Sequence, residues 1–122
     1  MKYTIGIDIG TSGTKTVMFD EKGGKIASAT VEYPLYQPQN GWAEQDAADW
    51  WRASYESCKA VITESGVDPR DIAAVGLSGQ MHGLVMLDEA GQLLRRSIIW
   101  CDGRTAEECK IVEDLVDRKS VV

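Results

Sequence analysis

The chain has 122 residues, of which 43% are hydrophobic and 26% are charged, and its formal net charge is −6 at pH 7. This length and composition are typical of one globular domain, or of part of a larger one, and they exclude a disordered chain. The acidic balance excludes the basic surface with which proteins bind nucleic acid or anionic lipid, so we expect neither partner.

The N-terminus and the cysteines indicate the cellular compartment. No apolar run approaches the roughly 20 residues of a membrane span, and Met1-Lys2 leads into a strand without the apolar stretch of a signal peptide. Cys58, Cys101 and Cys109 are odd in number and lack the Cys-x-x-Cys spacing of zinc sites, so we interpret them as reduced thiols. We therefore expect a cytoplasmic protein.

The chain begins with a predicted β-hairpin. Tyr3 to Ile9 alternates in polarity and is rich in β-branched residues, which predicts a strand. Gly10 to Gly13 predicts a tight turn, and Thr14 to Phe19 the returning strand. Lys25 to Glu32 resumes the β pattern after a polar turn, so we expect a third antiparallel strand.

The turn of this hairpin has the composition of a phosphate-binding site. Small residues expose backbone N–H groups, the hydroxyls of Thr11 and Ser12 add donors, and Lys15 adds a positive charge. Asp8 interrupts the apolar strand, and a hydrated Mg2+ beside nucleotide phosphates is a common way to offset such a charge. The alternative is an ordinary hairpin turn after a polar strand end, since short motifs recur by chance.

A long loop and an amphipathic helix follow. Prolines and the dipeptide Asn40-Gly41 predict a loop from Tyr33 to Gln45. We expect Asp46 to cap a helix that stops at Gly66, with Asp49 as its capping-box partner. Apolar and small residues recur on this helix at helical spacing, and we expect most of them to be core rather than a surface for stacking a sugar or base. They are Trp50, Trp51, Ser54, Tyr55, Ser57, Cys58, Val61 and Ile62.

The second half of the chain predicts another strand-loop-strand unit. Ile72 to Leu77 is an apolar run typical of a central strand covered on both faces. It leads into a loop, Ser78 to Gly83, that contains the only histidine of the chain, His82. Further strands are predicted over Leu84 to Leu87 and over Ser97 to Trp100.

The C-terminal segment predicts a last helix. Trp100 to Arg104 closes the preceding strand, and we expect Thr105 to cap a helix that reaches Val116. Residues 117–122 show no clear cap, which indicates a piece of a longer protein. Strands that alternate with helices predict an α/β or α+β domain with ligands at the ends of its central strands.

Three segments are therefore expected to meet in one cleft: the turn after Ile9, the loop after Ser78 and the segment that begins at Trp100. Taken singly, His82 and Asp102 have simpler explanations, as a histidine bonded to a backbone carbonyl and as a turn residue, and Trp100 could be a core aromatic. Their combination favours a binding site.

Four motifs, in order, resemble the FGGY family of carbohydrate kinases, and especially its xylulokinase branch. They are Gly6 to Lys15, Gly41 to Asp46 with Trp50-Trp51, Gly76 to Gly83, and Trp100 to Arg104. The resemblance spans nearly the whole chain but only the start of the family's length. It implies an α/β fold of the ribonuclease-H-like (actin/hexokinase-like ATPase) kind, a mixed sheet with flanking helices. Residues 1–122 would be the N-terminal part of the first of two such domains, with the second absent.

The resemblance also implies roles for individual residues. Asp8 matches a carboxylate needed for activity and for Mg2+, which it would hold indirectly. The residues matched to the ATP phosphates are Thr11, Ser12, Gly13 and Lys15. Met81 and His82 match a pair that touches the ketose, and Trp100 matches an aromatic against the sugar, with Asp102 close by. The Gln80 amide adds a polar group suited to a polyol.

The implied reaction transfers the γ-phosphate of ATP to a hydroxyl of a ketopentose. It would convert D-xylulose to D-xylulose 5-phosphate. Glycerol-kinase-like members carry Arg-Glu where this chain has Met81-His82, so we expect xylulose rather than glycerol. Cys101 stands where the family usually has asparagine, a small departure. The adenosine pocket and the catalytic base would lie outside this chain. We therefore expect the isolated chain to be inactive and to self-associate through exposed apolar surface.

Three alternatives remain open from the residues. The chain could belong to a kinase for another sugar or polyol. An actin- or chaperone-like nucleotide switch would share the hairpin of Asp8 but would have no need for the segments of His82 and Trp100. A sugar-sensing domain would keep those segments and could lose Asp8. The chain has both the hairpin of Asp8 and the segments of His82 and Trp100, and this combination favours a kinase.

Overall fold

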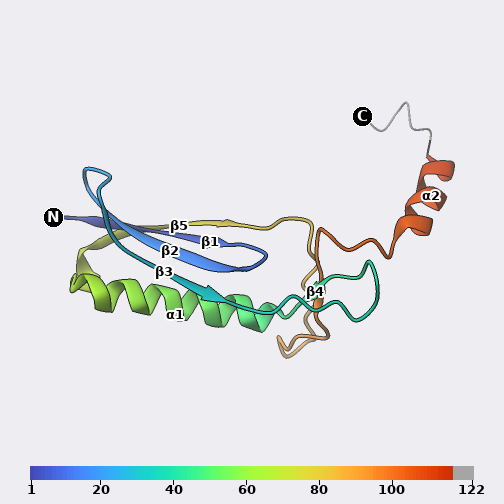
Figure 1. The fold of residues 1–122 in the computed structure, drawn as a ribbon, viewed down its shortest axis with the longest axis horizontal. Coiled ribbons are helices and arrows are strands. Elements are labelled where there is room, and N and C mark those ends of the chain that lie inside the picture. The colour runs from blue at the N-terminus through green and yellow to red at the C-terminus, as the bar shows by residue number, and fades with distance from the viewer. Residues whose placement is uncertain (117–122) are drawn as a thin grey trace.

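A four-stranded mixed sheet forms the centre of the fold, which a computed structural model describes over residues 1–116. Strand β1 (Tyr3–Ile9) pairs antiparallel with β2 (Gly13–Asp20), and β2 pairs antiparallel with β3 (Lys25–Glu32). Strand β5 (Ile72–Gly79) pairs parallel with β1, so the order is β3-β2-β1-β5 (Figure 1). The predicted hairpin, third strand and mixed sheet are confirmed.

Helix α1 (Ala47–Ser65) runs along one face of this sheet (Figure 1). The Asp46 side chain accepts a backbone N–H of the first turn, and the helix ends at Gly66 in a left-handed conformation with φ 68°. Both predicted ends are therefore confirmed. The predicted capping box does not form, because the Asp49 carboxylate accepts from Arg52, one turn along the helix, at 3.3 Å.

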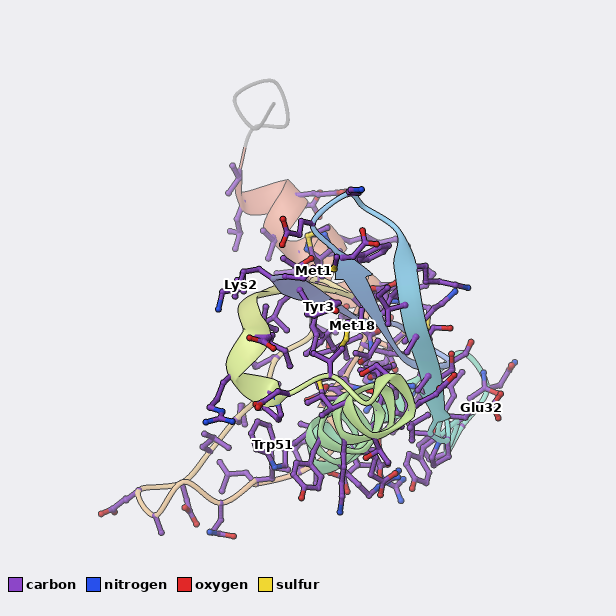
Figure 2. All side chains as sticks on the ribbon, turned by 90° about the vertical axis from the view of Figure 1, so that its left-hand side faces the viewer. Met1, Lys2, Tyr3, Met18, Glu32 and Trp51 are labelled. Carbon is purple, nitrogen blue, oxygen red and sulfur yellow. The ribbon has the colours of Figure 1, made fainter. Side chains whose placement is uncertain are left out.

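The core lies between α1 and the sheet. The side chains of successive strand residues point to opposite faces, so the alternate residues of β1 and β2 are buried under the helix. Figure 2 shows Met18 between the strands and α1, where it is completely buried. One polar pair crosses the same interface, since the hydroxyls of Thr16 and Ser57 lie 2.6 Å apart. The buried apolar cluster consists of Ile5, Ile7, Met18, Ala27 and Val61.

The buried stripe of α1 is narrower than predicted. Ala53, Ser57 and Val61 are the buried residues of the helix, whereas the side chains of Trp51 and Tyr55 are 77% and 60% exposed. Small residues let the helix approach the sheet closely, so the larger residues of the predicted stripe lie on its flank, as Figure 2 shows for Trp51. The prediction that most of the stripe is core was wrong for these two aromatics.

Strand β5 is an edge strand over the described residues, which corrects the prediction of a central, covered strand. A short 3-10 helix, η1 (Pro69–Asp71), leads into it. Val75 and Leu77 pair with Ile5 and Ile7 and share their side of the sheet, yet they are 57% and 74% exposed. The reason is that α1 packs mainly over β2 and β3 and leaves most of β5 uncovered.

A small second sheet joins the middle of the chain to its C-terminal part. Strand β4 (Glu44–Gln45), inside the predicted loop, pairs antiparallel with β6 (Ser97–Ile98). The predicted strand over Leu84 to Leu87 is wrong, because this segment makes only one isolated bridge, between Leu87 and Leu93. The chain does return beside this segment, since the backbone N–H of Leu94 donates to the carbonyl of Met86 at 3.1 Å, but the return is too short to extend the pairing into a ladder.

Helix α2 (Ala106–Leu115) follows and lies apart from the sheet layer (Figure 1). Thr105 occupies the predicted N-cap position, but its side chain makes no capping hydrogen bond. The expectation for residues 117–122 lies outside the described residues. Within residues 1–116, the structure contains no helix of the length and apolar character needed to cross a membrane.

Candidate functional site

The turn between β1 and β2 is held by hydrogen bonds to its carbonyl oxygens. The side-chain amide of Gln45 donates to the carbonyl of Thr11 at 2.5 Å. The hydroxyl of Tyr33 donates to the carbonyl of Gly10, and the Tyr33 backbone N–H donates to that of Ser12 at 3.4 Å. Burial raises the pKa of Tyr33 above its usual value, so the hydroxyl keeps its proton. Residues outside the hairpin therefore fix the turn.

The same turn leaves backbone donors available. The N–H groups of Thr11 and Ser12 donate to no other described residue, while the carbonyls of these residues are bonded. A Cβ at Gly13 would lie 2.7 Å from the carbonyl oxygen of Val31, so only glycine permits this close approach of β3. Adjacent free N–H groups in a tight turn form a concavity that binds anions. The turn can therefore accept a phosphate group.

Two opposite charges lie beside this turn. Asp8 and Lys15 face each other directly in the β1–β2 ladder, and both are exposed. Asp8 lies on the sheet face opposite α1, next to Ser78 of β5. Neither charged group makes a hydrogen bond or ion pair with another described residue. Both are therefore available to a ligand at this end of the sheet.

The loop after β5 forms one wall of a shallow pocket of about 260 Å³. The loop begins where the backbone N–H of Gln80 donates to the carbonyl of Ile9 at 2.9 Å, which extends the pairing with β1. His82 has φ 67°, a left-handed conformation that is uncommon outside glycine. The pocket is lined by Gly79, Gln80, Met81, His82 and Trp100. Four of the five predicted sugar residues thus lie together.

Trp100 joins this pocket to the turn. Its indole N–H donates to the hydroxyl oxygen of Thr11 at 3.0 Å. An indole nitrogen is only a donor, so the Thr11 oxygen must accept, and the hydroxyl proton is left for another acceptor. The tryptophan wall of the pocket therefore orients a donor of the turn.

Asp102, the fifth predicted sugar residue, does not line the pocket. Its carboxylate accepts from the backbone N–H of Ala43 at 2.7 Å and from the Arg104 guanidinium at 2.8 Å. These hydrogen bonds hold the pKa of Asp102 well below its usual range, and the bond from Arg104 has the largest effect. The buried carboxylate of Glu44 accepts from Arg104 at 2.7 Å and from Arg95 at 2.8 Å. This cluster fastens the segment of Trp100 to the segment before α1.

Few side chains of the site could coordinate a metal ion. Among residues 1–116, no group of three or more histidine, cysteine, aspartate or glutamate side chains is arranged to hold a metal ion. Mg2+ usually keeps several waters and is bound through one or two carboxylates together with substrate phosphates. The unpaired carboxylate of Asp8 fits that pattern, and it does not fit a metal held by protein ligands alone.

Three residues of this site were not among the site residues predicted from the sequence. Gln45 is completely buried and bonded to the turn, Tyr33 bonds the same turn, and Trp50 bonds Gln45 at 3.1 Å. The available signal was weak: an amide placed just before a helix cap, within a loop rich in aromatic residues. Their partners are 5 to 34 positions away, so spacing did not indicate the contacts.

The sequence and the fold resemble known proteins. A model of the "FGGY family of carbohydrate kinases, N-terminal domain" matches residues 3–122. The xylulose kinase of Bacillus subtilis is 43% identical over 109 residues, which are 89% of this chain and 22% of that protein. A glycerol kinase from Acaryochloris marina is 36% identical over 127 residues, covering 98% of this chain and 25% of that protein.

Solved structures show the same relationship. The xylulose kinase from Rhodospirillum rubrum superposes with a TM-score of 0.89 at 30% sequence identity, covering 98% of this chain and 24% of that chain. The predicted ribonuclease-H-like fold of the actin/hexokinase-like ATPase kind is thereby confirmed. The chain spans about a quarter of the length of the relatives that it matches.

Proposed function

Because this chain belongs to the FGGY family of carbohydrate kinases, we propose that it is the N-terminal part of an ATP-dependent sugar kinase. The enzyme transfers the γ-phosphate of ATP to a hydroxyl of a ketopentose and converts D-xylulose to D-xylulose 5-phosphate. Residues 1–122 form the first part of the first ribonuclease-H-like domain. The remaining length of such a kinase supplies the second domain, with the adenosine pocket and the catalytic base.

The observation that carries this proposal is the hydrogen bond between the Trp100 indole and the Thr11 hydroxyl. It brings an anion-binding turn into contact with an aromatic-walled pocket that also contains Gln80 and His82. Phosphoryl transfer requires little covalent work from a protein, but it requires the two substrates to be held in line. A nucleotide switch has no use for the pocket, and a sugar sensor has no use for the turn.

The phosphates of ATP lie at the turn. The free backbone N–H groups and the hydroxyls of Thr11 and Ser12 donate to phosphate oxygens, Gly13 permits the tight turn, and Lys15 contributes its charge. Asp8 would hold the hydrated Mg2+ that accompanies ATP. When bound, the ion would neutralise charge that develops on the phosphates. The exposed, unpaired carboxylate of Asp8 supports this role.

The sugar lies in the pocket beyond β5. Among residues 1–116, the buried Oε1 atom of Gln80 has no hydrogen-bond partner, so it can accept from a sugar hydroxyl. His82 offers a further polar group, and Met81 and Trp100 offer apolar surface to the carbon skeleton. Asp102 acts on the sugar indirectly, through the position of the Trp100 segment.

Two observations support D-xylulose as the substrate. They are the Met81-His82 pair and the higher sequence identity to a xylulose kinase than to a glycerol kinase. The Bacillus subtilis relative, at 43% identity, is named a xylulose kinase, and the Acaryochloris marina relative, at 36%, is named a glycerol kinase. A site built to bind particular hydroxyls rejects analogues that lack them, because its buried polar groups are then unpaired. Glycerol is therefore the informative competitor.

In the reaction, a sugar hydroxyl oxygen forms a bond to the γ-phosphorus while the bond from that phosphorus to the β–γ bridging oxygen breaks. ADP leaves with that electron pair, and the hydroxyl proton passes to the catalytic base. Residues of this chain bind and orient the two substrates. Closure of the two domains excludes water, which would otherwise compete as the acceptor.

The test is a coupled ADP-release assay on a full-length kinase that contains these residues, with D-xylulose, glycerol and gluconate as acceptors. We expect kcat/KM to be highest for D-xylulose. A higher value for glycerol or gluconate would assign the protein to another sugar or polyol. Absence of sugar-dependent turnover, with ATP or sugar still bound, would favour a nucleotide switch or a sugar sensor.

A further inference from the structure

Gln45 is the point at which three parts of the site meet. Its side chain is completely buried at the end of β4, just before the cap of α1. The Nε2 atom donates to the carbonyl of Thr11 at 2.5 Å. The Oε1 atom accepts from the indole of Trp50 at 3.1 Å and from the side-chain amide of Gln80 at 2.7 Å. One side chain thus contacts the turn, the helix and the loop after β5.

Trp50 decides which way the Gln45 amide is oriented. A glutamine amide can turn over and exchange its oxygen and nitrogen, but an indole nitrogen can only donate. The Oε1 atom of Gln45 must therefore face Trp50, and its Nε2 atom must face the carbonyl of Thr11. All three bonds agree with this single orientation, since the carbonyl of Thr11 can only accept.

The orientation of Gln45 in turn decides that of Gln80. The Oε1 atom of Gln45 accepts, so the atom of Gln80 that faces it must be the Nε2 donor. The Oε1 atom of Gln80 is then left over: it is buried and has no hydrogen-bond partner among residues 1–116. Gln80 also lines the pocket with Met81, His82 and Trp100. A fixed acceptor without a partner selects for a ligand that brings a donor there.

We propose that Gln45 is a positioning residue that couples the two substrate sites of the kinase. It holds the Thr11 carbonyl and so the shape of the phosphate turn, and it holds the Gln80 amide with its oxygen as the acceptor for a substrate hydroxyl. Trp50 fixes the orientation of the Gln45 amide, which in turn fixes that of the Gln80 amide. We call this series of hydrogen bonds, from Trp50 through Gln45 to Gln80, the relay. The inference rests on the proposed function, because the hydroxyl and the phosphate are those of the sugar and of ATP.

The test begins with Gln45→Met, which keeps an unbranched side chain of similar length but removes both polar atoms. In the full-length kinase we expect the KM for D-xylulose to rise about tenfold, because the Gln80 amide can then turn over. The KM for ATP rises by a smaller factor. Trp50→Phe should raise the KM for D-xylulose about threefold, since the Gln45 amide loses the donor that orients it.

The matched control is Trp51→Phe, the same change at the next residue, which is 77% exposed and lies outside the relay. It should leave both KM values within about twofold. A residue that serves stability alone would lower the unfolding temperature and the active fraction, but it would not change KM. Equal KM values for wild type and Gln45→Met would therefore overturn the proposal.

A double-mutant cycle tests whether Gln45 acts through Gln80. If it does, Gln80→Ala and the double variant Gln45→Met/Gln80→Ala should show the same KM for D-xylulose, about tenfold above wild type. Effects that multiply to about a hundredfold would overturn the proposal while leaving the kinase function intact.

NMR of the 122-residue chain checks the contact without any assay of activity. Gln45→Met should shift the indole N–H resonance of Trp50 and leave that of Trp51 in place. An unmoved Trp50 resonance would overturn the relay alone. If wild-type full-length protein shows no sugar-dependent turnover, the proposed function fails, and the coupling of substrate sites fails with it.

Discussion

The indole N–H of Trp100 donates to the hydroxyl of Thr11 at 3.0 Å, although the two residues are 89 positions apart in the sequence. The first residue belongs to the wall of the candidate sugar pocket, and the second belongs to the candidate phosphate turn. Because the indole can only donate, this bond leaves the Thr11 hydroxyl proton free for a phosphate oxygen. The wall of the candidate pocket thus contacts a donor of the candidate turn directly.

The first prediction separates the indole nitrogen of Trp100 from its ring. Trp100→Phe keeps an aromatic surface but loses the N–H, so we expect the KM for ATP to rise about fivefold while the KM for D-xylulose stays within about twofold. Trp100→Ala should raise the KM for D-xylulose as well, because the wall of the pocket is lost. Steady-state kinetics of the full-length kinase check both variants. Identical kinetics for wild type and Trp100→Phe would contradict this role of the hydrogen bond.

The second prediction concerns Asp8, whose carboxylate is exposed beside the turn. Asp8→Asn in the full-length kinase should lower kcat by about a hundredfold or more and leave sugar affinity nearly unchanged, because the charge acts at the metal and phosphates. Glu32→Gln is the control, since it removes the same charge at another exposed position of the sheet. Kinetics combined with a sugar titration test this, and an unchanged kcat would remove Asp8 from the mechanism.

The third prediction concerns the pH dependence of stability at Asp102. The Arg104 guanidinium lowers its pKa in the folded state, so its stabilising contribution is complete above the unfolded value of about 3.9 and is lost as the pH falls below that value. Asp102→Asn should lower the unfolding temperature by several degrees at pH 7. The difference from wild type should shrink below about pH 4.

The matched control for that experiment is Asp68→Asn. Asp68 bonds Arg70 two positions on, just as Asp102 bonds Arg104, and its pKa is also lowered, but its side chain is 42% exposed against 2% for Asp102. An exposed pair is screened by water, so this variant should hardly change the unfolding temperature. Equal effects of the two substitutions would show that burial does not matter here.

The fourth prediction concerns the isolated chain. An unpaired strand edge with exposed apolar side chains is a template for association, and β5, an edge strand within residues 1–116, presents Val75 and Leu77 beside such an edge. We expect the 122-residue chain to self-associate, and Leu77→Lys to reduce this association. Leu94→Lys, at a 57% exposed leucine outside β5, is the control. Sedimentation analysis distinguishes the three proteins; equal self-association of all three would place the interface elsewhere.

The same chain tests the division of labour in the proposed kinase. Without the second domain, it should show no ATP-dependent phosphorylation of D-xylulose and at best millimolar affinity for the sugar, since each loss of about 1.4 kcal/mol weakens binding tenfold. A coupled ADP-release assay and a sugar titration measure both quantities. Robust turnover by the isolated chain would show that the active site is complete within these residues.

Local patterns predicted much of the fold. The β1–β2 hairpin, the third strand and both ends of α1 follow from alternation, glycine turns and the Asp46 cap, which act over a few neighbouring residues. The strand predicted over Leu84 to Leu87 failed for a different reason. An apolar run becomes a strand only beside another strand, and that neighbour is not a property of the run.

The sequence by itself determined the residue types of the candidate site and their order, because a glycine turn with hydroxyls has only a few uses and the motifs resemble one family. Only the tertiary structure decided how they meet. It placed the Trp100 indole on Thr11, turned the Asp102 carboxylate to Arg104 and made Gln45 a buried connector. Such contacts depend on the path that packing imposes on distant segments, and each bond direction depends on which partner can only donate.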